Sequence, residues 1–539
     1  MSLLQELLPA YLIRQRWFGA KSRTISSVRI LDWVELPNIP AAIVFLEITY
    51  ADGAADVYQL PLALTIGPDA DTIRTAAPAS ILASLNTAKG PAILHDATAR
   101  EDVRQALLAL IETGDTLVAS TANDTTDTAP RATLQGRTSS AFAAARGAAP
   151  LPARTGSAEQ SNTSILYDQK LILKLFRRLQ SGENPDTEIG RFLTEAAHFP
   201  RIAPFLGEIR GSRAGEQTPD NEKTTLAMLQ GLVENECDGW QFTLDELAHY
   251  YEGVVTCPVP DPDALGTVAS FLDDPASAKT PALAREHAGL YLDAAALLGR
   301  RTGEMHLALA TPTDNPAFAA EPVTPEALAA DAARIDAQIT RTLDALKRAF
   351  TTLPDELTTD SAALILSRRI ELFARAHALT KSSAADSGQR IRIHGDYHLG
   401  QVLRARGDYV LLDFEGEPAR SLAERRAKQS PLKDVAGMLR SFSYAAFSAL
   451  DHFTQRHPNT AKSLEPWAQL WQNAVSTEFL TAWRTTMGAN PHLTPQPRQA
   501  HLLLNAYLLE KALYELLYEL NNRPTWVRIP LAGILGLPH

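Results

Sequence analysis

Cysteine is nearly absent from this 539-residue sequence, which contains only Cys237 and Cys257. Their spacing fits neither a redox pair nor a zinc ribbon, which excludes a disulfide framework and indicates a reducing compartment. Long apolar runs are also absent, since none approaches the roughly 20 residues that a membrane-spanning helix needs. The N-terminal stretch mixes Glu6 and Arg14 into its apolar residues, unlike a signal peptide. We therefore expect a cytoplasmic protein without a membrane partner.

Basic residues are in deficit, because 51 Lys and Arg stand against 62 Asp and Glu, for a net charge of -11. Nonspecific nucleic-acid binding needs clustered Lys and Arg to contact phosphates, so no nucleic-acid partner is expected. The composition, 45% hydrophobic and 21% charged, is globular. The length predicts two to four domains, and a chain of this size buries a large core without disulfides or metal ions.

The N-terminal part of the sequence is rich in β-type patterns. Residues 28–66 contain short alternating runs such as "AAIVFLEITY", which predict a small antiparallel sheet. Residues 80–113 are interpreted as helical, with "REDVRQALLALIE" as the clearest amphipathic stretch. Residues 114–150 are rich in Thr, Ala, Ser and Gly and are predicted to be a linker or intermediate segment. The sequence thus predicts a cap domain over residues 1–113.

A second β-rich region is predicted over residues 151–234. It contains "NTSILYDQKLILKLF", a helix that Asn184 caps with Pro185 in its first turn, and the strand "TTLAMLQGLV". From residue 235 to 539 the apolar residues recur at the 3.6-residue period of helices, as in "PEALAADAARIDAQITRTLDALKRAF". The predicted order is a β-rich cap, a small β lobe and a large helical lobe.

One β segment interrupts the helical lobe, "RIHGDYHLGQVLRARGDYVLLDFEGEP" at residues 392–418, and it is the densest polar stretch of the chain. The strand "YVLL" places Asp413 at its end, while Asp396 lies on the preceding loop and Gln401 follows five positions later. Phosphoryl transfer needs a carboxylate to orient the attacking oxygen and hard oxygen ligands for magnesium. Asp396 is the candidate base, and Gln401 and Asp413 are the candidate metal ligands. The alternative interpretation is a β-hairpin with polar ends.

Lys174 is the second candidate, because it lies among apolar residues in "LILKLF" and an unpaired buried lysine is costly. Glu188, in the next predicted helix, is its candidate partner, since a Lys–Glu pair can position the phosphates of a nucleotide. Before this strand lies "EQSNTS", where Ser161 and Asn162 are candidates for phosphate contacts although no glycine is present. The alternative is an edge-strand lysine whose ammonium reaches solvent.

The third candidate is the helix "YLLEKALYELLYELNNRP" near the C-terminus. A helical wheel places its leucines on one side and Lys511, Tyr514, Glu515 and Tyr518 on the other. Two tyrosines with charged groups suit a sugar site, in which rings stack and charged groups bond hydroxyls. A solvated helix face is the alternative interpretation.

A histidine, an aspartate and a group of three arginines are predicted to have structural rather than catalytic roles. His306 is predicted to be a buried core histidine, and Asp434, near the start of a predicted helix, a cap or loop brace. Arg420, Arg425 and Arg426 could neutralise phosphate charge, but a solvated loop is the favoured interpretation.

Four separated stretches, in this order, resemble bacterial maltokinase: "RQRWFGAKSR", "HGDYHLGQVL", "LLDFEGEPARSLAERRAKQSPLKDVAGMLRSF" and "EKALYELLYELNNRPTWVRIPLAGI". The resemblance extends over nearly the whole chain. It implies an α+β, bilobal fold, protein-kinase-like and similar to aminoglycoside phosphotransferases, with a β-rich N-terminal cap. It also implies that ATP and magnesium are used to phosphorylate maltose at its anomeric hydroxyl. The maltose 1-phosphate formed would enter α-glucan and glycogen synthesis.

The resemblance assigns roles residue by residue. It implies that Asp396 is the catalytic base, that Gln401 and Asp413 bind magnesium, and that Lys174 and Glu188 position the phosphates, with ATP between the two lobes. It implies maltose contacts for three residues of the last long helix, Lys511, Tyr514 and Tyr518. Because the same domain is fused to trehalose synthase in some bacteria, an association with trehalose synthase is a further expectation.

Two other functions stay open at this point. One is a kinase of the same fold with a different acceptor, such as glucosamine, trehalose or an aminoglycoside. The other is a non-catalytic scaffold partner of an α-glucan enzyme, against which the presence of Lys174, Asp396 and Asp413 argues.

Overall fold

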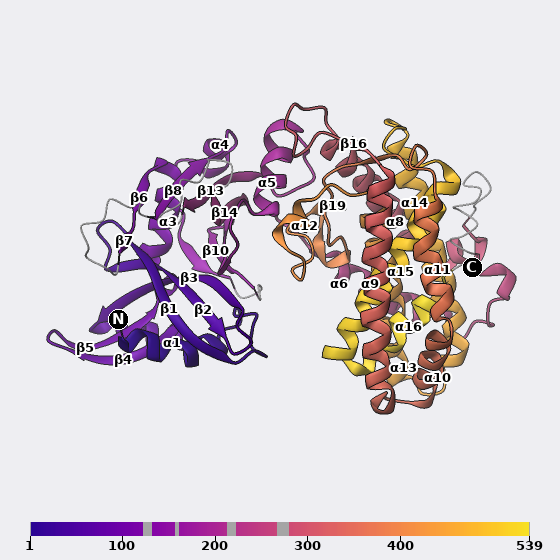
Figure 1. Cartoon of the computed structure of the whole chain (residues 1–539), viewed down its shortest axis with the longest axis horizontal. Helices are drawn as coiled ribbons and strands as arrows, with labels where there is room; N and C mark the ends of the chain where they lie inside the picture. The colour runs from indigo at the N-terminus through magenta and orange to yellow at the C-terminus, as the bar shows by residue number, and fades with distance from the viewer. Residues whose placement is uncertain (1, 122–131, 157–160, 213–222, 267–279, 538–539) are drawn as a thin grey trace. The chain divides into compact units, whose positions relative to one another are not determined.

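The computed structural model describes residues 2–121, 132–156, 161–212, 223–266 and 280–537. It divides into two compact units, Met1–Glu234 and Asn235–His539 (Figure 1). The division falls where the β-rich half of the sequence gives way to the helical half. In the described residues, no helix combines the length and the apolar character needed to cross a membrane.

The first sheet of the N-terminal unit is antiparallel, in the order β4-β5-β3-β2-β1-β7, and β12 pairs with β3. Its strands are β1 (Ile25–Glu35), β2 (Ala41–Tyr50), β3 (Ala55–Ile66), β4 (Ile81–Thr87), β5 (Gly90–Asp96), β7 (Ser120–Thr121) and β12 (Arg178–Leu179). The helix α1 (Ser2–Arg14) packs on it through Leu8, Tyr11 and Leu12, and α2 (Pro68–Ala76) follows β3. The antiparallel sheet predicted within residues 28–66 is therefore confirmed.

The second sheet has the order β6-β8-β13-β14-β11-β10-β9 and is also antiparallel. Its strands are β6 (Thr116–Val118), β8 (Thr133–Thr138), β9 (Ala153–Thr155), β10 (Thr163–Tyr167), β11 (Leu171–Leu175), β13 (Phe205–Ser212) and β14 (Thr224–Gly231). The helices α3 (Glu101–Thr113), α4 (Phe142–Arg146) and α5 (Pro185–Arg191) accompany it. Asn184 accepts a hydrogen bond from the backbone NH of Asp186 at 2.8 Å, so the predicted cap of α5 is confirmed.

A buried glutamine joins the two sheets. Nε2 of Gln59, on β3, donates to the carbonyl of Phe176 at 2.8 Å and to that of Leu226 at 2.7 Å. Nearby, Arg177 and Asp96 form a buried ion pair at 2.7 Å. Since one apolar core contains residues of both sheets, the cap and the small β lobe form one unit.

Two predictions for this unit were wrong. Residues 81–96 were expected to be helical, but they form the hairpin β4–β5, whose turn uses Gly90 at φ +109°. Residues 114–150 were expected to be a linker or intermediate segment; residues 122–131 lie outside the described residues, and in the described part β6 and β8 extend the second sheet. Gly136 has a packing role, because a Cβ there would lie 1.8 Å from the carbonyl oxygen of Leu110 on α3. This glycine, one of the small residues that suggested a flexible segment, instead lets α3 pack directly on β8.

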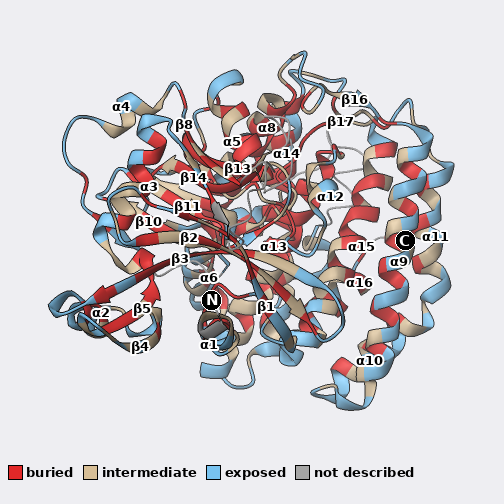
Figure 2. Cartoon of the chain, turned by 60° about the vertical axis from the view of Figure 1, so that its left-hand side comes forward, coloured by how far each residue is buried: buried red, intermediate tan, exposed pale blue. Residues whose placement is uncertain are grey.

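The C-terminal unit is mostly helical. Its longer helices are α6 (Gly239–Val254), α8 (Ala282–Leu309), α9 (Pro325–Ala349), α10 (Glu356–Ser367), α11 (Arg369–Ala378), α13 (Leu432–Arg456), α14 (Ala461–Met487), α15 (Pro497–Asn522) and α16 (Arg528–Leu535). The predicted helical periods of α8, α9, α13 and α15 are confirmed. On α9 the buried positions follow one side of the helix, as Figure 2 shows.

A small antiparallel sheet, β15-β18-β19, is inserted among these helices. It consists of β15 (Cys237–Asp238), β18 (Val402–Ala405) and β19 (Asp408–Leu411). The predicted β segment in the helical lobe is thus confirmed, and Asp413 follows β19 as expected. This sheet positions the polar loop at residues 392–401.

Glycine allows a close contact between two helices of this unit. A Cβ on Gly299 of α8 would lie 2.2 Å from the carbonyl oxygen of Phe479 on α14. We predict that Gly299→Ala lowers the free energy of unfolding by about 1–3 kcal/mol through overpacking, measured by urea denaturation. Gly253→Ala is the control, because its Cβ would meet nothing within 4 Å and alanine favours a helix. Equal stability of both variants would contradict the prediction.

Candidate functional site

A buried carboxylate holds the polar loop at residues 392–401. The side chain of Asp434, at the start of α13, accepts hydrogen bonds from the backbone NH groups of His394 and Gly395, each at 2.9 Å. Nε2 of His306 lies 3.1 Å from the same carboxylate, and Nε1 of Trp483 donates to Nδ1 of His306 at 3.0 Å. Because Nδ1 accepts, Nε2 carries the proton and donates to Asp434. The predictions of a loop brace and a core histidine are confirmed.

Asp434 stays ionised although it is buried. Burial raises the pKa of its carboxyl. The hydrogen bonds from His306 and from the backbone NH of Gly395 help to outweigh burial, so the pKa lies below its ordinary value. The loop therefore rests on a carboxylate with fixed acceptors rather than on a neutral acid.

His394 connects this loop to the end of β19. Its Nε2 donates to the carbonyl of Leu412 at 2.8 Å, and its ring lies 4.8 Å from that of Phe414. The residue next to Leu412 is Asp413, which adopts a left-handed conformation at φ +64°. Such a conformation is uncommon outside glycine and occurs often at functional positions.

Gln401 and Asp413 come together as the sequence predicted. Nε2 of Gln401 donates to Oδ2 of Asp413 at 3.1 Å. The amide oxygen of Gln401 and the carboxylate of Asp413 are hard oxygen donors of the kind that magnesium prefers, so the chemistry of the two side chains fits the ion.

Asp396 lies beside Lys511 of α15. Nζ of Lys511 donates to Oδ1 of Asp396 at 3.0 Å and to Oε1 of Glu417 at 3.2 Å. Burial raises the pKa of Asp396, but the Lys511 charge outweighs burial and lowers the pKa of the carboxyl below its usual value. The carboxylate is therefore ionised at neutral pH and can accept a proton.

A cavity of about 480 Å³ opens beside Asp396 and Lys511, in the size range of small-molecule sites. It is called the aromatic cavity below because five rings line it, those of Trp240, Tyr444, Tyr514, Tyr518 and Trp526. The predicted face of α15 therefore borders a cavity, although Tyr518 itself stays 46% exposed.

Every carboxylate that lines the aromatic cavity, among the described residues, has a cationic partner. Glu515 accepts two hydrogen bonds from Arg440 at 2.8 and 2.9 Å. Glu519 accepts from Arg523 at 2.7 and 2.9 Å, and Asp396 is paired with Lys511 as described above. The cavity thus offers rings and hydrogen-bonding groups without an uncompensated negative charge.

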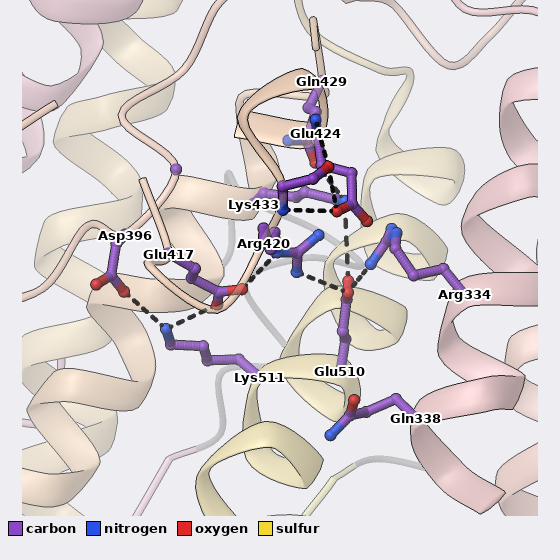
Figure 3. A network of polar contacts seen from close by, with 12 residues as sticks. Arg334, Gln338, Asp396, Glu417, Arg420, Glu424, Gln429, Lys433, Glu510 and Lys511 are labelled. Carbon is purple, nitrogen blue, oxygen red and sulfur yellow. Dashed lines mark hydrogen bonds and ion pairs between the residues drawn. The ribbon is translucent and has the colours of Figure 1, made fainter. Parts of the chain in front are cut away.

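A second cavity, of about 440 Å³, shares Asp396, Lys511 and Tyr514 with the first. It is called the charged cavity because ion pairs line it (Figure 3). Arg420 donates to Glu417 at 2.5 Å and to Glu510 at 3.2 Å. Arg420 was expected in a solvated loop, but it is partly buried in this network.

Lys433 is the most buried cation of this network. Its ammonium lies 3.6 Å from Asp331 and 3.9 Å from Glu510. Burial is the largest influence on Lys433 and lowers its pKa to about 7. The network therefore contains one lysine whose charge is costly to maintain.

The predicted nucleotide contacts belong to the N-terminal unit. Nζ of Lys174, on β11, donates to Oδ2 of Asp186 at 3.3 Å, and Glu188 is buried on the same helix α5. The pairing of Lys174 with Glu188 stays a prediction. Ser161 and Asn162 directly precede β10, whereas residues 159–160 of the "EQSNTS" stretch lie outside the described residues.

Sequence reasoning missed several residues of this region. Glu417 and Glu510 were missed; both pair with Arg420, and Glu417 also pairs with Lys511, but no local pattern connects Glu417 with Lys511 or Arg420 with Glu510. Arg523 and Trp526 were in a quoted stretch but received no role. The sequence "NNRPTW", which spans the end of α15 and the turn after it, was the signal that could have identified them.

Comparisons with known proteins agree on the class. Residues 11–99 match the family model of the maltokinase N-terminal cap domain. A solved glucosamine kinase in complex with glucosamine, ADP and inorganic phosphate aligns with 99% of this chain and 99% of its own, at a TM-score of 0.59 and 20% identity. The fold is thus the α+β kinase-like fold with an N-terminal cap, as the sequence resemblance implied.

Two glucosamine kinases are similar in sequence. The one from Streptacidiphilus jiangxiensis is 25% identical over 398 residues, 72% of this chain and 75% of that protein. The one from Mycolicibacterium smegmatis (strain ATCC 700084 / mc(2)155) is 26% identical over 394 residues, 73% of this chain and 80% of that protein. Together with the cap, these similarities support a sugar kinase of this fold.

The Asp434 brace can be tested by stability. Asp434→Asn replaces one acceptor oxygen with an NH2 group that faces buried donors, so we predict a loss of about 1–3 kcal/mol in the free energy of unfolding. Because the folded pKa of Asp434 is depressed, this difference should shrink as the pH falls below about 4. Urea denaturation over a pH series measures both effects. Asp451→Asn, an exposed change on α13, is the control, and a matching loss there would contradict the assignment.

Proposed function

We propose that this protein transfers the γ-phosphoryl group of ATP to the anomeric hydroxyl of maltose, giving maltose 1-phosphate. The observation that carries the proposal is the aromatic cavity, in which the candidate base Asp396 lies beside all three predicted sugar residues, Lys511, Tyr514 and Tyr518. Aromatic rings stack on the apolar faces of sugar rings, and charged groups bond their hydroxyls.

Asp396 is the proposed base. Its ionised carboxylate accepts the proton of the sugar hydroxyl while the sugar oxygen bonds to the γ-phosphorus and the bond to the β-phosphate oxygen breaks. Lys511 keeps this carboxylate ionised until the proton arrives. Gln401 and Asp413 are the proposed ligands of magnesium, which when bound neutralises phosphate charge. In the N-terminal unit, Lys174, Glu188, Ser161 and Asn162 are the proposed nucleotide contacts.

Glucosamine is the second candidate acceptor, because the similar proteins named above are glucosamine kinases. Its ammonium group needs an uncompensated carboxylate to offset the loss of water. In the aromatic cavity the carboxylates of Asp396, Glu515 and Glu519 are already paired. This charge balance favours a neutral sugar over an amino sugar.

The proposed product indicates a metabolic route and a partner protein. Maltose 1-phosphate would serve α-glucan and glycogen synthesis, with trehalose synthase as a partner that supplies maltose. Cys237 and Cys257 are both free thiols, which agrees with the proposed cytoplasmic location.

The acceptor is identified by a sugar panel. We predict ATP-dependent turnover on maltose, with a phosphorus NMR signal of a sugar 1-phosphate, and at least tenfold lower kcat/KM on glucosamine, glucose and trehalose. If turnover on glucosamine exceeds turnover on maltose, glucosamine rather than maltose is the acceptor. The absence of turnover on every sugar would favour a scaffold role.

Replacing the proposed base, Asp396, should lower turnover without weakening ATP binding. In Asp396→Asn the side chain keeps its size but cannot take a proton, so we predict a fall in kcat of about 10²- to 10⁴-fold. ATP affinity, measured by calorimetry, should change less than about threefold. Asp386→Asn, an exposed position outside the polar loop, should retain full turnover. Near-normal turnover of Asp396→Asn would exclude the assigned role.

A further inference from the structure

Two glycine turns meet in the lining of the charged cavity. Gly395 and Gly416 both adopt left-handed conformations, at φ +83° and +72°. A Cβ built on Gly395 would lie 3.3 Å from the Cα of Gly416. Both positions therefore favour glycine for its backbone conformation, and their contact leaves little room for a side chain. The loop that carries Asp396 thus approaches the segment after β19 closely.

Each glycine directly precedes a carboxylate, and both carboxylates reach the same ammonium group. Asp396 accepts from Nζ of Lys511 at 3.0 Å, and Glu417 accepts at 3.2 Å. Lysine has a flexible four-carbon chain, so one acceptor alone does not fix where its ammonium lies. Two acceptors from two different loops define that position.

Glu417 is itself held from behind. Its side chain is 8% exposed, and its second oxygen accepts from Nε of Arg420 at 2.5 Å. Arg420 in turn donates to Glu510 of α15 at 3.2 Å, and Glu510 is also paired with Arg334 of α9 (Figure 3). Glu417 is therefore anchored to helices that pack in the core of the C-terminal unit.

We propose that Glu417 is a positioning residue, which holds the ammonium of Lys511 against the catalytic carboxylate Asp396. The inference rests on the proposed role of Asp396 but does not depend on which sugar is the acceptor. Glu417 acts through Lys511, and it lines the charged cavity but not the aromatic cavity that is proposed for the sugar. Its contribution is geometric, because the acceptor oxygen keeps Lys511 in place.

This role has a consequence for the ionisation of Asp396. Burial raises the pKa of this carboxyl, and the adjacent Lys511 charge is the main influence that lowers it, followed by smaller influences of His398 and His394. When Lys511 is free to move away, the pKa of Asp396 rises. The base is then protonated over a larger part of the acidic pH range, and the acid limb of the kcat profile moves to higher pH.

The test compares two variants that both lack the Glu417 charge. Glu417→Gln keeps an acceptor oxygen at the same place, whereas Glu417→Met keeps a similar volume without a strong acceptor. We expect kcat of Glu417→Met to be about tenfold below that of Glu417→Gln, with KM for ATP within about twofold. We also expect the acid limb of kcat to lie at higher pH in Glu417→Met. Identical kcat values and pH profiles would overturn the proposal.

A second readout does not require turnover. The titration of Asp396 is followed by carboxyl carbon NMR in protein labelled with ¹³C-aspartate and is assigned with Asp396→Asn. The midpoint should be higher in Glu417→Met than in Glu417→Gln, and highest in Lys511→Met. Equal midpoints in the two Glu417 variants would reject the positioning role even when no sugar is turned over. An inactive wild type with these shifts would instead reject the proposed function alone.

Two further variants guard against a general loss of structure. Glu424→Gln keeps the N-terminal cap of the neighbouring helix α12 (Leu422–Arg426) and should match wild type in turnover and in the Asp396 titration. If Glu417→Met does not fold, Arg420→Gln is used instead, because it removes the hydrogen bond from Nε of Arg420 that holds the Glu417 carboxylate. It should shift the titration in the same direction, and an unchanged titration in folded Arg420→Gln would reject the proposal.

Discussion

The carboxylate of Asp434 is the contact on which the polar loop of the C-terminal unit depends. It accepts hydrogen bonds from the backbone NH groups of His394 and Gly395, which precede Asp396, and another from Nε2 of His306. A loop with this many buried polar groups is stable only when those groups are paired. Because the brace comes from the first turn of α13, the position of Asp396 is set by a helix rather than by the loop itself.

Charge balance is the second constraint, and it shapes what the site can bind. The carboxylates of the aromatic cavity are paired with lysine or arginine, so the cavity is polar but nearly neutral. Buried ion pairs contribute little net stability, yet they fix side chains in defined places. In this protein they hold Glu515 and Glu519 beside the aromatic rings as fixed acceptors, which suits hydroxyl groups better than cations.

The sequence predicted what local patterns encode. Helical periods identified α9 and α15, and the polar stretch at residues 392–418 brought Gln401 and Asp413 together as expected. It failed where the outcome depended on distant partners. The hairpin at residues 81–96 forms because β5 pairs with β3, and Gly136 serves helix packing, which no local pattern reveals. Glu417 was missed because its partner Lys511 is remote in sequence.

Gln59 has a consequence for how the cap is connected to the rest of the chain. Its amide donates to the carbonyl of Phe176, just after β11, and to that of Leu226 on β14, and β12 adds an edge to the first sheet. Deleting the cap would remove one donor from each of these carbonyls and uncover a shared core. The cap is therefore not a detachable module with a hinge of its own. A ligand or protein bound to the cap would therefore contact the same compact unit that contains Lys174.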